Sequence, residues 1–171
     1  MNTMLKYPLN KKYTRKVNEM SETKQEEKIP TITDFPVEWQ IIVRATQSLV
    51  SKTRDGADIE IYRTKYSFTF NSKRTYLEVR YDVTRKLLEV TWEKYRMYDG
   101  VRDTAFIKTA EKRIEKEEEA LELLSALYER ILTHIKYKSN TTVIYKDLYY
   151  LCNMFEELRK EREEKKEESK Q

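Results

Sequence analysis

The alternation of apolar and polar side chains between residues 58 and 98 constrains the fold more than any other feature of the chain. Leu77 and Val79 point to one side of an extended backbone while Glu78 points to the other, and the flanking runs alternate in the same way. A period of two residues is typical of strands with one buried face. Short polar segments separate the runs. The sequence therefore predicts an antiparallel meander of three strands, or of four if the first run divides near Lys65.

A helix is predicted before the sheet, over residues 36–53. Asp34 and Pro36 are typical of a helix start, because they supply a capping acceptor and a preset φ. Apolar side chains then recur every three or four residues and form one stripe, which comprises Phe35, Trp39, Ile42, Ala45 and Leu49. A sheet with one apolar face needs a cover, and we expect this stripe to supply it.

After Asp99 and Gly100 the apolar period becomes helical almost to the end of the chain. Polar residues at 138–142 interrupt it, so two long C-terminal helices are predicted, forming a hairpin or a coiled coil. The apolar stripe is wider than one partner helix would cover, which favours a homodimer. The predicted seam and oligomer interface comprises Ile107, Ile114, Leu121, Leu124, Tyr128, Ile131, Ile135, Leu148, Leu151 and Phe155.

These elements predict an α+β protein in which an N-terminal helix packs on a 3–4 stranded antiparallel meander and two long helices follow. The length of 171 residues suits one ordinary core. We expect four parts: a flexible basic and polar arm at 1–32, a helix and sheet domain at 33–100, a helical hairpin or zipper at 101–160, and a charged tail at 161–171.

The composition indicates the cellular compartment and the kind of source organism. The lone Cys152 cannot form an internal disulfide, and no apolar run approaches the length that spans a bilayer. We therefore expect a cytoplasmic protein without a membrane partner. The two Gly and three Pro, together with abundant Lys and Glu, match the bias of thermophile proteins, in which surface ion pairs are common.

Aromatic and basic residues interleave along the predicted sheet, which is typical of surfaces that stack on unpaired bases and follow phosphates. An ion-paired structural face is the alternative, because Glu78, Asp82, Glu89 and Glu93 share the polar side. Once the rings assigned to the core are set aside, the candidate nucleic-acid-binding residues are Arg63, Lys65, Lys73, Arg74, Tyr76, Arg80, Arg85, Lys86, Tyr95, Arg96 and Tyr98.

Signals for catalysis or metal binding are weak. A metal-dependent nuclease would need clustered acids and a Glu-x-Lys string, and the nearest match is Glu78-Val79-Arg80. His134 is the only histidine and has no ligand partner at a suitable spacing, so we expect a surface or seam residue. Cys152 is expected to be a small buried apolar residue. The sequence predicts no catalytic residue, no metal and no cofactor.

The order of parts, with an aromatic and basic meander from Tyr62 to Tyr98 and then a zipper through Ile107, Ile114, Leu121 and Leu124, resembles the ThermoDBP-type single-stranded-DNA-binding proteins of archaea. The resemblance extends over the layout and composition of residues 36–160. In that family a basic-edged cleft with apolar walls holds the strand and the zipper makes the dimer. It implies the same role here, and an archaeal or archaeal-viral source.

We therefore expect a non-catalytic, dimeric protein that binds single-stranded DNA or RNA. Two alternatives stay open. One is a structural or assembly protein, with a virus or a plasmid as a candidate source, that binds a protein partner and no nucleic acid. The other is the metal-dependent nuclease.

Overall fold

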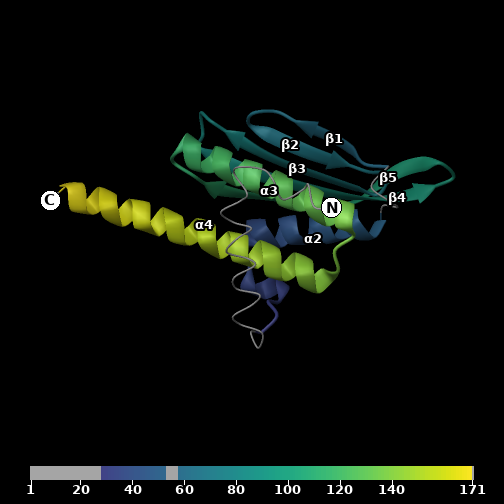
Figure 1. Ribbon diagram of the computed structural model, residues 1–171. Helices are drawn as coiled ribbons and strands as arrows, with labels where there is room; N and C mark the ends of the chain where they lie inside the picture. Colours follow the sequence, from purple (N-terminus) through teal and green to yellow (C-terminus); the bar gives the residue numbers. More distant parts are fainter. Residues whose placement is uncertain (1–27, 53–57, 171) are drawn as a thin grey trace.

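The computed structural model describes residues 28–52 and 58–170 (Figure 1). Most of the predicted flexible arm at 1–32 therefore lies outside the described residues. In chain order the elements are a short 3-10 helix η2 (Ile32–Asp34), α2 (Val37–Lys52), β1 (Glu60–Arg63), β2 (Ser67–Asn71), β3 (Thr75–Asp82), β4 (Leu87–Tyr98), β5 (Val101–Arg113), α3 (Glu117–Tyr137) and α4 (Thr141–Lys170).

The strands form one antiparallel sheet in the order β1-β2-β3-β4-β5, so each strand pairs with its neighbour in the chain. The register places Phe70 opposite Leu77 and Leu77 opposite Trp92, all on the inner face that carries the core. The first predicted run does divide near Lys65, into β1 and β2. The α+β class and the antiparallel meander are confirmed, but the sheet has five strands instead of three or four.

The fifth strand corrects the prediction of a helix from residue 101, which is wrong for residues 101–113. Asp99 (φ 47°) and Gly100 (φ 80°) both adopt the left-handed conformation and turn the chain back onto the free edge of β4, with Tyr98 opposite Val101. Two such residues between strands are the usual two-residue hairpin turn. The seven-residue spacing of Ile107 and Ile114 is coincidental, because β-branched residues such as Val101 and Ile107 suit a strand better than a helix.

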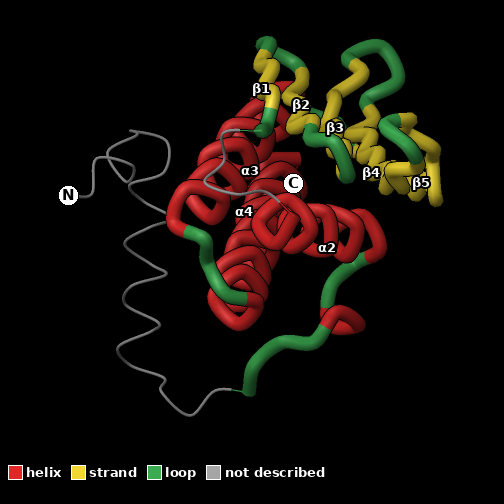
Figure 2. Tube along the Cα trace, turned by 90° about the vertical axis from the view of Figure 1, so that its right-hand side faces the viewer, coloured by secondary structure: helices red, strands yellow, loops and turns green. Residues whose placement is uncertain are grey.

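The three helices lie on one side of the sheet (Figure 2). Helices α2 and α3 pack directly on the inner face, and α4 packs on both from outside. The predicted stripe is confirmed, since Trp39, Ile42 and Leu49 of α2 are all buried in the core. The last part of α4, which contains residues 161–170 of the predicted charged tail, continues as a helix that projects past the sheet (Figure 1).

The predicted seam residues contribute mainly to the chain's own core. Ile114 is buried in the loop before α3, and Ile107 is 57% exposed on β5. Leu121 and Tyr128 pack half-buried against the core. The remaining seam residues are buried in it, namely Leu124, Ile131, Ile135, Leu148, Leu151 and Phe155. A zipper between two chains through these side chains would require α3 or α4 to leave this core.

A buried polar cluster joins α3 to α4. Asp147 forms an ion pair with Arg130 (Nη2 to Oδ1, 3.2 Å) and lies 2.7 Å from His134 (Nε2 to Oδ2). The other ring nitrogen of His134 lies 2.8 Å from the hydroxyl of Ser139, in the turn between the helices. His134 is thus buried between two helices, and its function in the fold is to link them. The predicted break is confirmed for residues 138–140, with Lys138 left-handed and the Asn140 side chain accepting from the amide of Val143, whereas Thr141 and Thr142 already lie in α4.

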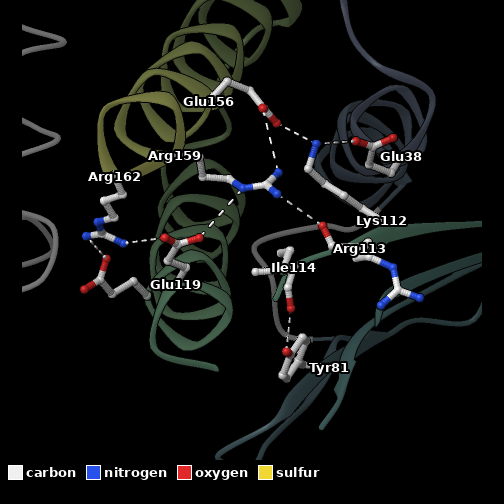
Figure 3. Close-up of polar contacts among 10 residues, drawn as sticks. Glu38, Tyr81, Lys112, Arg113, Ile114, Glu119, Glu156, Arg159 and Arg162 are labelled. Carbon is white, nitrogen blue, oxygen red and sulfur yellow. Dashed lines mark hydrogen bonds and ion pairs between the residues drawn. The ribbon is translucent and has the colours of Figure 1, made fainter. Parts of the chain in front are cut away.

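A second polar network fixes the end of β5 to all three helices (Figure 3). Lys112 lies between Glu38 of α2 (3.2 Å) and Glu156 of α4 (2.5 Å). Arg159 and Arg162 of α4 both reach Glu119 of α3, at 3.7 and 3.2 Å. Because these groups come from four elements, the network fixes the position of α4 against the rest of the fold.

Cys152 is buried on α4 next to this network, as predicted. Burial, followed by the negative charge of Glu156, raises the pKa of its thiol to about 12. The folded chain therefore holds the thiol proton more tightly than the unfolded chain does. This contribution to stability is complete below about pH 9, the ordinary thiol value, and is lost as the pH rises toward 12.

We accordingly expect Cys152 to be almost inert toward iodoacetamide at pH 8 in the native protein and to react rapidly in denaturant, because alkylation requires an accessible thiolate. Mass spectrometry of timed aliquots measures both rates. A native rate close to the denatured rate would show that the α4 packing described here is wrong.

Candidate nucleic-acid interface

The structure divides the predicted nucleic-acid-binding residues between two opposite ends of the sheet. We call the β2–β3 turn and the projecting part of the β4–β5 hairpin (residues 92–108) the hairpin end, because the amide of Tyr95 donates to Arg74 O there. The β1–β2 and β3–β4 turns form the opposite end, here called the turn end. The hairpin end holds Lys73, Arg74, Tyr76, Tyr95, Arg96 and Tyr98, and the turn end holds Arg63, Lys65, Arg80, Arg85 and Lys86.

The cations of the turn end already have partners. Arg80 donates to Glu89 at 3.1 Å, and this bond raises the pKa of the guanidinium. Arg85 lies 3.9 Å from Glu89, and Lys86 lies 3.4 Å from Glu115. Arg63 and Lys65 lie over the rings of Tyr128 and Tyr66, at 5.1 and 5.3 Å from the centroids. A phosphate at this end would have to compete with these contacts.

The outer face of the sheet, which the helices do not cover, is acidic outside the hairpin end. The register places Glu78 beside Thr69 and Thr91, and Glu89 beside Glu111. Carboxylates of this density repel a phosphate backbone. The charges of the outer face therefore do not favour a bound strand there.

On the outer face of the hairpin end, cations and rings lie together. The guanidinium of Arg102 stacks 3.7 Å from the ring centroid of Tyr95 and donates to Asn71 at 3.4 Å. Tyr95 is buried beneath it and donates to Glu93 at 3.2 Å. Burial, with Glu78 nearby, raises the pKa of Tyr76 to about 12, so this phenol stays neutral near pH 7.

The inner face of the hairpin end carries a second group of rings and cations. Phe106 meets Trp92 edge to face, with centroids 4.9 Å apart. The ammonium of Lys94 lies 5.8 Å from both centroids, and that of Lys108 lies 5.5 Å from Phe106. The tip of the β4–β5 hairpin reaches past the ends of α2 and α3 (Figure 1), whereas Trp92, at its base, is buried at the margin of the core.

The cations of the hairpin end differ from those of the turn end in their partners. Within the described ranges, 28–52 and 58–170, no ion pair joins them to a carboxylate. Asp103 lies opposite Arg96 in the register without an ion pair, and Glu93 and Asp99 are the other nearby acids. These cations are Lys73, Arg74, Lys94, Arg96, Arg102 and Lys108.

Sequence reasoning missed Trp92, Lys94, Arg102, Phe106 and Lys108 as candidates. Three of them, Arg102, Phe106 and Lys108, lie on β5. This segment was predicted as part of a helix with Ile107 on its apolar seam, so its other side chains were not considered for binding. The signal that could have found them is Asp99-Gly100, since this dipeptide between two alternating runs is a strong indication of a hairpin. Trp92 was assigned to the core, where it is indeed buried, but at the margin that adjoins the hairpin.

Other kinds of site find no support in the part of the chain that the structure describes. It contains no group of three or more His, Cys, Asp or Glu side chains that could hold a metal ion. Among the same residues, no helix has the length and apolar character needed to cross a membrane.

Comparison with known proteins adds no identity. Neither the known protein families, nor the curated proteins, nor the solved structures gave a match to this chain. Of the residues that carried the resemblance in layout, Ile107 and Ile114 lie outside the helices. The candidate interface therefore stands on its own geometry.

Proposed function

We propose that this protein binds single-stranded nucleic acid, without catalysis, at the hairpin end of its sheet. The observation that carries the proposal is the contrast between the two ends. Cations without carboxylate partners adjoin aromatic rings at the hairpin end, while most cations of the turn end are neutralised by carboxylates.

Single strands suit this arrangement because their bases are free to stack and their phosphates can follow a curved path. Stacking on an aromatic side chain contributes about 1–3 kcal/mol per base, and each cation that meets a phosphate releases a counterion. A duplex offers neither exposed base faces nor this flexibility. The proposal therefore requires preference for single strands and steep weakening with salt.

We expect the combined substitutions Lys94→Ala, Arg96→Ala and Lys108→Ala to weaken binding strongly. Loss of three phosphate contacts should lower the slope of log affinity against log salt by about 2, since each contact with a single strand contributes about 0.7. Fluorescence anisotropy with a labelled mixed-sequence single strand, measured from low to high salt, gives the slope. An unlabelled duplex of the same sequence serves as competitor.

The matched control is the combined variant Arg80→Ala, Arg85→Ala and Lys86→Ala. It removes the same number of positive charges from the turn end, so long-range attraction falls equally. We expect its slope to stay close to that of the unmodified protein. Equal losses in both variants would contradict a localised site. Absence of single-strand binding at every salt concentration would remove the function and favour the assembly alternative.

The proposal requires one copy of the chain. The predicted homodimer stays a prediction, which light scattering checks directly. A dimer, if formed, would need a surface other than the buried seam residues.

A further inference from the structure

Trp92 has an unusual environment for a residue at the edge of a core. Its side chain is 5% exposed, yet within the described part of the chain the indole Nε1 has no hydrogen-bond acceptor. A buried donor without an acceptor is unfavourable, and native structures contain few of them. A group that supplies an acceptor at this nitrogen gains a bond that the residues described by the structure do not supply.

Trp92 belongs to the core, and part of its cover comes from side chains of the proposed interface. Phe106 presents its ring at 88° to the indole, and Lys94 reaches over both rings. Lys94 pairs in the register with Phe106, and Lys108 with Trp92 itself, so all four lie on the inner face. The cover is partly a flexible lysine chain, which can swing aside without any change in the backbone.

A nucleotide supplies a ring that can stack, a phosphate for the lysine and a hydrogen-bond acceptor for the indole N–H. A base ring can stack where Lys94 now contacts Phe106, and the displaced ammonium remains within reach of the adjoining phosphate. The indole N–H then requires an acceptor on the base edge. Thymine and uracil carry two exocyclic carbonyl oxygens, whereas the acceptors of adenine are ring nitrogens, of which N1 and N7 adjoin an amino group that would oppose the indole N–H donor to donor.

We propose that the hairpin end prefers carbonyl-bearing bases, with one such base accepting a hydrogen bond from Trp92 Nε1 while it stacks on Phe106. The inference rests on the proposed function and adds a substrate preference to it. Its physical basis is that sites built to satisfy a specific buried polar group discriminate more strongly than apolar ones.

The test compares oligo(dT) with oligo(dA) of equal length by anisotropy at one low salt concentration. Trp92→Phe keeps an aromatic ring and removes the donor together with part of the indole's volume, so the two strands are compared within the same variant. We expect the affinity for oligo(dT) to fall about 10-fold, which is the size expected for one hydrogen bond, and the affinity for oligo(dA) to stay unchanged. The ratio of the two affinities thereby excludes general weakening.

Trp39→Phe is the matched control, because Trp39 is the chain's other tryptophan and lies 1% exposed in the core beneath the sheet. It should leave the oligo(dT) to oligo(dA) ratio unchanged. In this variant Trp92 is the sole indole, so we expect oligo(dT) to quench and shift its emission and oligo(dA) to quench it without the shift. This second measurement keeps the inference testable if Trp92→Phe folds poorly.

The outcomes separate the inference from the proposed function. Unchanged oligo(dT) affinity in Trp92→Phe, or identical emission changes with both strands, would overturn the base preference while single-strand binding stands. Failure of the unmodified protein to bind either strand would overturn the proposed function and the inference with it.

Discussion

Replacing Asp147 by alanine is expected to lower the free energy of unfolding by about 3–5 kcal/mol. Asp147 is the carboxylate that Arg130 and His134 share, and all three side chains are buried between α3 and α4. Removing it takes away one charged partner of a buried guanidinium, and breaking a buried ion pair from one side is costly. Urea unfolding followed by circular dichroism gives the change.

The control for this prediction is Glu111→Ala. Glu111 forms a 4.0 Å pair with Arg85 in which both side chains are more than half exposed. Exposed pairs contribute about 0–1 kcal/mol, so little change is expected. Similar small losses for both variants would mean that the α3–α4 cluster is hydrated and not buried as described.

Replacing Phe68 by alanine is expected to lower the free energy of unfolding by about 3–5 kcal/mol. Phe68 is fully buried and its ring lies 5.6 Å from that of Phe70 and 5.8 Å from that of Tyr128, so it joins the sheet to α3. Its removal leaves a cavity at this junction. Thermal and urea unfolding both measure the loss.

Tyr62→Ala is the comparison for Phe68→Ala. Tyr62 lies on the adjoining strand β1 and is 68% exposed, so its removal should change stability by less than about 0.5 kcal/mol. A large loss at Tyr62 together with a small loss at Phe68 would reverse the assignment of the inner and outer faces.

Local patterns in the sequence were sufficient to predict the elements in which apolar residues repeat with a single period and whose ends are clearly marked. Leu77 and Val79 are buried because alternation decides the face of a strand once one face is covered. Trp39, Ile42 and Leu49 follow in the same way from the helical stripe. In these elements, the local signal and the tertiary packing agree.

Residues 101–113 show why the rest was not predictable from spacing alone. Ile107 and Ala110 fit a helical repeat with Ile114, yet they lie on β5 with Ile107 outside the core. The free edge of β4 and the left-handed Asp99-Gly100 turn determine the outcome, and only the turn is visible in the sequence. Tertiary pairing overrides a weak local period.

Only part of the candidate site could be predicted from the sequence, for a related reason. Basic residues are visible in the sequence, but their availability depends on partners brought by the register. Arg80 pairs with Glu89 from the next strand, whereas Lys94 lies opposite Thr75 and Phe106. Charge neutralisation across strands therefore separates the two ends of the sheet.

The meander order of the sheet has a consequence for the kinetics of folding. Each strand pairs with its neighbour in the chain, so the sheet forms through short loop closures that cost little entropy. Helix α2 is the exception, because it must pack against β5, and the Glu38–Lys112 contact spans 74 residues. We therefore expect hairpin formation to be fast and the docking of α2 to limit the rate at which the native state appears.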